Sequence, residues 1–486
     1  MSHVGRCVPG AHKLLIGRVG GPARREEKER DMRKSISKLM ASRRQAIALG
    51  VGGAVTLALG ACSGGGTDGS TTTEETPAPV TPGAIVAADE VSPTGYTVTF
   101  AFDGTGSEKA IESVSVTGPF RHIDPALDLM DEKNDFAPQD YVAGQYASNY
   151  IPSAGMEKGW GYTEEMTDED GDGVYTVSFP LASGSYAYSY LVKYEGEDEP
   201  VTIEDPANPS PASLNPNSIT PTGDITHSIV YGAYDADRQG DTPNLDFVLP
   251  ATGDVGTLEY VSYEGMDGVT QYLGVYVPTG YDANAADPYK VIYMSHGGGG
   301  NETDWFAMGH VDNIMDNALA AGEATEALIV TMDNSHYEWD FAKIEENVLK
   351  HIIPFVEATY NVSTDAADRA FCGLSMGCMT TMHMYFDHPT EFAYLGMWSA
   401  ADMDAVKDTE GLDYPTVMAA VGTCDIASEK IMPNDDEQQK KYEDFERWVA
   451  TQDLPNIHCD GYVLGSHDWF TWSQCFHTFV TEYLWK

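Results

Sequence analysis

The sequence predicts two domains, a small all-β sandwich followed by a larger α/β domain. Short segments of alternating apolar and polar residues, separated by Gly, Asp and Pro, occupy residues 85–240 and are typical of a sandwich. Further on, apolar runs at 291–295, 369–372 and 416–424 are typical of buried parallel strands. We place the α/β domain at residues 245–486. Because 486 residues exceed one ordinary domain, the chain is long enough to form both.

A sharp turn between a strand and a helix carries the first chemical signal. The strand at 369–372 runs into Gly-Leu-Ser-Met-Gly at residues 373–377, and a helical pattern follows as far as His388. Such a turn needs glycine on both sides, because a Cβ there would clash with neighbouring backbone. The turn lifts the Ser375 hydroxyl out of the sheet, beside the helix N-terminus. Ser375 is therefore the candidate nucleophile, and a turn without chemistry is the alternative.

A nucleophilic serine needs a general base and a group that orients the base. The apolar strand at 416–424 ends at Asp425, and a later predicted strand leads to His467. Because the carboxyl ends of parallel strands meet at the same edge of a sheet, we expect both side chains to lie near the serine. His467 is the candidate base and Asp425 the candidate acid. Asp402 and Asp404 are alternatives for the acid.

A glycine-rich loop follows the strand at 291–295. Its sequence is His-Gly-Gly-Gly-Gly at residues 296–300, which suits backbone N–H groups aimed at an oxyanion. We expect the donors to be Gly298, with Gly297 as the alternative, and Met376, the residue after the candidate nucleophile. A phosphate-cradling loop is disfavoured, because the chain has neither Gly-Lys-Ser/Thr nor a Gly-x-Gly-x-x-Gly that opens a helix.

Residues from about 256 to 486 resemble the esterase D/feruloyl esterase group of α/β-hydrolases, the first carbohydrate esterase family. The motifs that carry the resemblance are, in order, Ser295 to Gly300, Asp304-Trp305-Phe306, Ile353 to Glu357 with Tyr360, Arg369 to Gly377, Gly422 to Asp425, and Gly465 to Trp469 with Trp472. The resemblance implies an α/β-hydrolase catalytic domain whose triad is Ser375, Asp425 and His467. Cys378 departs from the family, which more often has a second glycine at this position.

The activity that the resemblance implies is that of a serine esterase, which hydrolyses carboxylic esters through an acyl-enzyme. Feruloyl or acetyl esters of polysaccharide are the expected substrates. Relatives with the same motifs hydrolyse siderophore esters of the enterochelin type or act as acyltransferases, so both activities stay open. A non-catalytic surface binding protein is the alternative of another class.

Aromatic residues flank the catalytic loops. We expect Trp305 and Trp469 to bind a flat phenolic group or a sugar ring, with packing as the alternative. No metal and no other cofactor is expected, because the sequence has no His-x-x-x-His or Cys-x-x-Cys pair. Cys424 and Cys459 are the preferred disulfide pair, and burial as thiols is the alternative.

Residues 1–61 are expected to be an export signal. Two arginines at 43–44 precede an apolar run at 46–61, a pattern similar to a twin-arginine signal. Leu-Gly-Ala-Cys at 59–62 resembles a lipobox, in which Cys62 becomes the lipidated first residue of the mature protein. A transmembrane helix is the alternative, but the run is short for a span of about 20 residues.

Two further features bear on localisation and partners. Met32, followed by Arg-Lys, is a more natural start than residue 1, and residues 62–84, rich in Gly, Thr, Glu and Pro, are expected to be a disordered tether. The formal net charge of −47 disfavours nucleic acid and anionic lipid headgroups as partners. We therefore expect an exported lipoprotein, periplasmic or at the cell surface, that touches the membrane only through its lipid anchor and binds a carbohydrate-linked ester.

The predicted sandwich resembles the early-set immunoglobulin-like modules that precede many bacterial esterases. Its clearest alternating segments are at 96–102, 113–117, 174–179 and 186–192. The aromatic residues of these segments are expected in the core, with sugar binding as the alternative. Residues 168–173 resemble the start of a calcium loop, but Phe179 stands where the loop needs its bidentate Glu. An acidic hairpin turn is therefore the prediction, with a calcium loop as the alternative.

Overall fold

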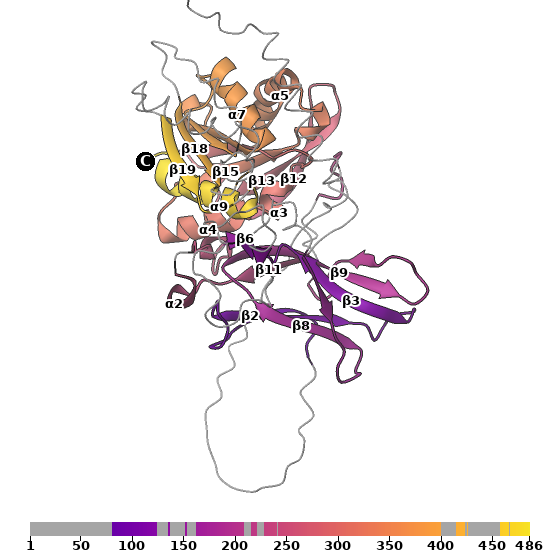
Figure 1. The fold of residues 1–486 in the computed structure, drawn as a ribbon. Coiled ribbons are helices and arrows are strands. Elements are labelled where there is room, and N and C mark those ends of the chain that lie inside the picture. Colours follow the sequence, from indigo (N-terminus) through magenta and orange to yellow (C-terminus); the bar gives the residue numbers. More distant parts are fainter. Residues whose placement is uncertain are drawn as a thin grey trace, which may run out of the picture. The chain divides into compact units, whose positions relative to one another are not determined.

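The structure is a computed structural model. It describes residues 80–123, 135–136, 151–152, 162–208, 215–220, 228–240, 242–399, 415–422, 425, 457–465 and 467–486 (Figure 1). The predicted export signal with Cys62, most of the predicted tether, the alternative acids Asp402 and Asp404, and Cys424 of the preferred disulfide lie outside the described residues.

The N-terminal domain contains two antiparallel sheets that share one apolar core. The first sheet has the order β1 (Gly83–Ala88), β2 (Tyr96–Asp103), β8 (Val174–Pro180). The second has the order β10 (Val201–Ile203), β9 (Gly184–Tyr194), β3 (Ile111–Gly118), β7 (Tyr162–Met166), with β11 (Ser228–Gly232) also paired to β9. Three short strands, β4 (His122–Ile123), β5 (Asp135–Phe136) and β6 (Ile151–Pro152), form a separate sheet.

The sandwich core is built from the alternating side chains that predicted it. Phe100 on β2, Phe120 after β3, and Tyr188 and Tyr190 on β9 have at most 1% of their surface exposed. The two tyrosine hydroxyls donate hydrogen bonds to buried Asp205, at 2.6 and 3.1 Å, so their polar ends are satisfied inside the core. The predicted sandwich is confirmed, and these aromatic residues are packing residues. Its kinship with immunoglobulin-like modules stays a prediction.

The C-terminal domain is built on one eight-stranded sheet. Its strand order is β12 (Thr257–Glu264), β13 (Thr270–Val277), β15 (Ala327–Met332), β14 (Lys290–Ser295), β16 (Arg369–Leu374), β17 (Tyr394–Trp398), β18 (Thr416–Gly422), β19 (Ile457–Val463). The pairs β12–β13 and β13–β15 are antiparallel, and every later pair is parallel. In the sheet, β15 and β14 stand in the reverse of their chain order, and the candidate serine follows β16, the fifth strand. This is the topology of α/β-hydrolases. The predicted fold class is confirmed.

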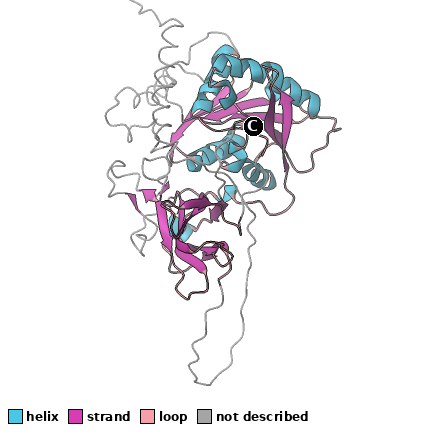
Figure 2. Ribbon diagram, turned by 90° about the vertical axis from the view of Figure 1, so that its right-hand side faces the viewer, coloured by secondary structure: helices cyan, strands magenta, loops and turns pink. Residues whose placement is uncertain are grey.

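Helices cover both faces of this sheet (Figures 1 and 2). On one face, α7 (Met376–Asp387) packs on β14, β16 and β17, and α5 (Phe341–Asn347) packs on α7. On the other face, α9 (Trp469–Thr478) packs on β17, β18 and β19, beside α4 (Val311–Ala321). The remaining helical segments are α2 (Ala236–Gln239), η4 (Asp246–Val248), α3 (Asp304–Ala307), η5 (Ser335–Tyr337), η6 (Val348–Ile352), α6 (Ile353–Thr359), η7 (Ala366–Asp368) and η8 (Phe479–Tyr483).

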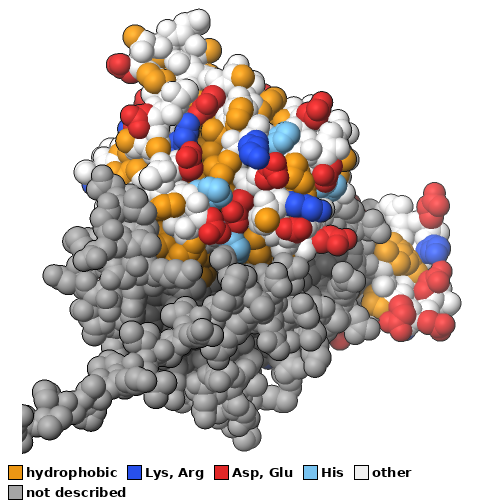
Figure 3. All heavy atoms as spheres, turned by 90° about the horizontal axis from the view of Figure 1, so that it is seen from above, with side chains coloured by type: hydrophobic (Ala, Val, Ile, Leu, Met, Phe, Trp, Pro, Cys, Tyr) orange, Lys and Arg blue, Asp and Glu red, His pale blue; other side chains and the backbone are white. Residues whose placement is uncertain are grey.

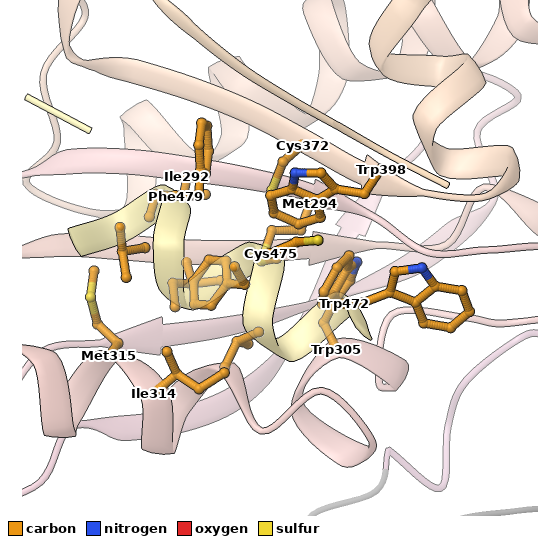
Figure 4. Packing of buried hydrophobic residues seen from close by; sticks show 14 of the residues in the cluster. Ile292, Met294, Trp305, Ile314, Met315, Cys372, Trp398, Trp472, Cys475 and Phe479 are labelled. Atoms are coloured by element: carbon orange, nitrogen blue, oxygen red, sulfur yellow. The ribbon is translucent and has the colours of Figure 1, made fainter. Parts of the chain in front are cut away.

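The apolar core between the sheet and helices α4 and α9 holds in place the strands whose carboxyl ends lead to the candidate catalytic residues. Figure 4 shows side chains of β14, β16 and β17 pointing toward Ile314 and Met315 of α4 and toward Trp472 and Cys475 of α9. Burying each large apolar side chain stabilises the fold by about 1.5–3 kcal/mol, so this layer holds the strand ends in place. No helix among the described residues is both long enough and apolar enough to cross a bilayer.

Candidate active site

The predicted turn after β16 is present and is sterically tight. Ser375 has φ 52° and ψ −117°, a conformation that costs a non-glycine residue about 1–3 kcal/mol. A Cβ on Gly373 would lie 2.3 Å from the Gly377 carbonyl oxygen, and a Cβ on Gly377 would lie 2.3 Å from the Ser295 carbonyl oxygen. Both glycines are therefore required, and Ser375 is partly exposed between the buried residues Leu374 and Met376.

Ser375, His467 and Asp425 form one hydrogen-bonded series. His467 Nε2 lies 3.1 Å from Ser375 Oγ, and His467 Nδ1 lies 3.0 Å from Asp425 Oδ1. Asp425 has no exposed surface and His467 has 5%. The buried carboxylate accepts a hydrogen bond from Nδ1–H, which leaves Nε2 free to accept the serine proton. The structure thus brings the three predicted residues together from the ends of β16, β18 and β19.

Packing around α9 fixes the position of His467. Asp468 caps this helix by accepting a hydrogen bond from the Thr471 N–H at 3.1 Å. The Trp472 ring meets the imidazole edge-on, with 5.1 Å between ring centroids, and its Nε1–H donates to Ser399 Oγ at 2.9 Å. The imidazole is therefore held in one orientation before any substrate arrives.

The glycine-rich loop passes directly beside the nucleophile. A Cβ built on Gly297 would lie 2.7 Å from Leu374 Cδ1 and 3.5 Å from Ser375 Cβ. Within the described part of the chain, the backbone N–H groups of Gly298 and Met376 donate no hydrogen bond to a protein group. Both are therefore available to an oxyanion. The choice of Gly298 over Gly297 stays a prediction.

His296 is a positioning residue that the sequence did not single out. Its Nδ1 lies 2.6 Å from the Gly297 carbonyl oxygen, and its Nε2 lies 3.0 Å from the Asn334 backbone N–H. Burial opposes protonation of His296, but Asp333 and Asp304 outweigh burial and raise its pKa. The N–H of Asn334 nonetheless requires an unprotonated Nε2 in this conformation. The proton therefore sits on Nδ1 and ties the imidazole to the loop backbone.

A short polar segment, residues 215–220, binds the residues that directly follow the glycine-rich loop. We call this segment the polar strap. Its Asn215 Nδ2 donates to Glu302 Oε1 at 2.8 Å, and its Ser218 hydroxyl donates to Glu302 Oε2 at 3.0 Å. In return, Asn301 Nδ2 donates to the Thr220 carbonyl at 2.8 Å. Asn215, Asn301 and Glu302 are all buried. The strap therefore supplies partners that buried polar groups of the loop require.

Removing one strap contact is expected to impair both activity and stability. Asn215→Ala leaves Glu302 Oε1 without its donor, which should lower the free energy of unfolding by about 1–3 kcal/mol. A loosened loop should also lower kcat about threefold to tenfold. Asn217→Ala is the matched control, because the Asn217 side chain is exposed. Chemical denaturation and ester turnover test both effects, and equal behaviour of the two variants would contradict the role of the strap.

Glu302 also makes stability depend on pH in a defined direction. Burial raises its pKa from 4.5 to about 7. The native state therefore binds the proton of the Glu302 carboxyl more tightly than the unfolded state does. The contribution of Glu302 to the free energy of unfolding is thus favourable below pH 4.5 and is lost as pH rises to 7. Glu302→Gln cannot ionise. Between pH 5 and pH 8 we expect its stability to improve relative to wild type by about 2–3 kcal/mol, measured by denaturant unfolding at both pH values. A parallel pH dependence of the two proteins would refute this.

The two tryptophans predicted to bind substrate occupy different environments. Trp305 has no exposed surface, and its Nε1–H donates to the Ser295 carbonyl at 3.1 Å. The prediction for Trp305 is therefore wrong, since a fully enclosed ring cannot touch substrate. Trp469 is only partly buried and meets Trp305 and Trp472 edge-on. Substrate binding by Trp469 stays a prediction.

Two groups of side chains among the described residues have the composition of a cation site, and neither belongs to the triad. One is Asp168, Asp170 and Asp172, the predicted acidic turn; the other is Glu345, His383 and Asp387. In the acidic turn, Asp168 and Asp172 accept hydrogen bonds from backbone N–H groups, as an ordinary turn requires. The cysteines Cys372, Cys378 and Cys475 are buried thiols.

Comparison with known proteins relates the C-terminal domain to one family and to parts of two curated proteins. Residues 270–481 match the family described as putative esterase. This segment lies within the domain whose strand order is that of the α/β-hydrolases. Two curated proteins are similar to part of this chain in sequence. An endo-1,4-beta-xylanase/feruloyl esterase of Xylanibacter ruminicola is 29% identical over 173 residues, which cover 33% of this chain and 24% of the relative. Endo-1,4-beta-xylanase Y of Acetivibrio thermocellus is 31% identical over 153 residues, which cover 29% of this chain and 14% of the relative.

The matching part of this chain thus corresponds to less than a quarter of either relative's length. Among solved structures, a CE1 ferulic acid esterase from Anaeromyces mucronatus in complex with ferulic acid is 20% identical with a TM-score of 0.42. The match covers 49% of this chain and 95% of that one.

Proposed function

We propose that this protein is a serine esterase. The observation that carries the proposal is the hydrogen-bonded series from Ser375 through His467 to Asp425, located in a domain that matches the putative esterase family. A buried acid, an oriented imidazole and a partly exposed hydroxyl on a tight turn are the components of nucleophilic ester hydrolysis.

Each step follows from this geometry. Ser375 Oγ attacks the ester carbonyl while His467 Nε2 takes the hydroxyl proton, and Asp425 stabilises the resulting imidazolium. The backbone N–H groups of Gly298 and Met376 stabilise the oxyanion. The same proton passes to the departing alcohol, which leaves an acyl-enzyme. Water then attacks the acyl carbon, gives a proton to His467, and the carboxylic acid is released as that proton returns to Ser375.

The substrate class that we propose is a feruloyl or acetyl ester on a plant polysaccharide. The similarity to an endo-1,4-beta-xylanase/feruloyl esterase supports this class. The net charge of −47 also disfavours an anionic catecholate ester, which would need basic residues near the site.

The deciding experiment compares kcat/KM for methyl ferulate, an acetylated xylo-oligosaccharide and a catecholate trilactone in one buffer. We expect one of the first two to be preferred. A clear preference for the trilactone would replace the proposal with siderophore esterase activity. An acyl-sugar product that outpaces free acid when a sugar acceptor is added would replace it with acyltransferase activity. No labelling of Ser375 by a fluorophosphonate probe would favour a non-catalytic binding protein.

We also propose that the protein is exported and anchored through a lipid on Cys62, because residues 59–62 resemble a lipobox. Cys62→Ser is expected to move the protein from the membrane fraction to the soluble fraction or to block its processing. A mature species that retains residues before Cys62 would contradict the anchor. This outcome is independent of the enzymatic assay.

A further inference from the structure

A second cluster of ionisable side chains lies between α5 and α7, away from the triad. His383 Nδ1 on α7 is 2.7 Å from Glu345 Oε1 on α5 and 3.5 Å from Asp387 Oδ2, one turn further along α7. The other oxygen of Glu345, Oε2, lies 3.0 Å from Nε2 of His388 at the end of α7. Figure 3 looks onto the face formed by α5 and α7, where histidine and acidic side chains lie side by side at the surface.

This cluster is separate from the catalytic residues. His383 is eight residues beyond Ser375, and the rise of an α-helix places the two about 12 Å apart along α7. The Glu345 and His383 side chains are 12% and 14% exposed, whereas that of Asp387 is 44% exposed. The cluster therefore has a shielded inner side and an outer side open to solvent, through which a small ion can enter.

The donor atoms select a class of ion. A Zn²⁺ ion with four ligands at 2.0–2.2 Å sets its ligand atoms about 3.3 Å apart. The distances of 2.7 and 3.5 Å around His383 Nδ1 come close to that spacing with small side-chain adjustments. An imidazole nitrogen with carboxylate oxygens suits Zn²⁺ and similar divalent transition metals, whereas Mg²⁺ and Ca²⁺ prefer oxygen alone.

Two surrounding features favour a cation here. Asp387 lies in the last turn of α7, where the helix dipole is negative, and His383 lies one turn before it. The His383 ring stacks on Phe341, with 4.6 Å between centroids and 15° between planes, which fixes the direction of its Nδ1. Burial raises the pKa of Glu345, but its hydrogen bonds and ion pairs with His383 and His388 lower it overall, so this carboxylate is ionised at neutral pH.

We propose that Glu345, His383 and Asp387 bind one Zn²⁺-class divalent cation, with a water as the fourth ligand and His388 supporting Glu345 through its second oxygen. The ion replaces the proton between His383 and Glu345 and joins α5 to α7. Because α7 begins at the nucleophile turn, the ion stabilises the helix that carries this turn. The proposal does not depend on which ester the protein hydrolyses.

The test measures Zn²⁺ binding by the tag-free full chain after treatment with EDTA and removal of the chelator. Isothermal titration calorimetry is expected to give one equivalent of Zn²⁺, with no comparable binding of Mg²⁺. Zn²⁺ should also raise the midpoint of thermal unfolding by several degrees.

Variants locate the ion. His383→Gln and Asp387→Asn should each weaken Zn²⁺ binding at least tenfold, and Asp387→Asn, at a half-exposed position, provides the test if His383→Gln does not fold. His351→Gln, which removes a histidine from the neighbouring η6, is the matched control and should bind like wild type. The proposal is overturned if Zn²⁺ does not bind, if both site variants bind like wild type, or if only Asp170→Asn in the acidic turn loses binding.

Discussion

Replacing Ser375 with alanine is expected to reduce ester turnover by about 10³-fold or more without unfolding the protein. The variant removes only the hydroxyl that lies 3.1 Å from His467 Nε2, and alanine occupies a similar volume in the turn. Turnover of p-nitrophenyl acetate measures the loss, and circular dichroism checks the fold. Ser107→Ala, which alters an exposed loop of the sandwich, should keep full activity.

The other two members of the series extend this prediction. His467→Ala should lose nearly as much activity as Ser375→Ala, whereas Asp425→Asn should lose somewhat less. Double variants should add little, because the three residues act as one unit. Full activity in Asp425→Asn together with its loss in Asp402→Asn would show that the acid is wrongly assigned.

Replacing Gly377 with alanine is expected to damage the site through the backbone. The added Cβ would lie 2.3 Å from the Ser295 carbonyl oxygen and 2.5 Å from that of His296. Neither oxygen can withdraw without moving the end of β14 and the start of the glycine-rich loop. We expect a loss of about 3 kcal/mol in the free energy of unfolding, and a loss of about 10²-fold in kcat from misplacement of the nucleophile.

Gly106→Ala provides the matched control for this substitution. Nothing lies within 4 Å of a Cβ at Gly106, so the same chemical change should leave stability and turnover nearly unaltered. Urea unfolding and p-nitrophenyl acetate turnover, measured for both variants, separate steric clash from the general effect of losing a glycine. A Gly377→Ala protein that matches Gly106→Ala in both measurements would refute the tight contact between the turn and β14.

The positions of Ser375, Asp425 and His467 were predictable because they depend on local patterns. Ser375 and Asp425 follow apolar runs of strand length, and His467 follows the shorter run Tyr462–Leu464. Parallel strands bring their carboxyl ends to one edge of the sheet whatever lies between them. The sandwich was predictable for a similar reason, since alternation along a strand such as 113–117 reports which side chains face a core.

Residues whose role depends on distant partners were not predictable. Trp305 lies next to the glycine-rich loop in sequence, but only the packing of α9 and β17 shows that its ring is enclosed. The polar strap has no periodic apolar pattern, and Asn215 meets Glu302 across 87 residues of chain. A buried polar pair at that separation leaves no signature in a single sequence.

The polar strap also limits how freely the esterase domain can be exchanged between proteins. Residues 215–220 precede the segment that matches the esterase family, which begins at residue 270. A domain excised at that boundary would lose the donors of Glu302 and the acceptor of Asn301, and each unpaired buried group costs about 1–3 kcal/mol. A chimaera that transplants this catalytic domain therefore has to carry about 55 residues of upstream chain with it. The segment needed for a stable active site is longer than the segment that sequence comparison detects.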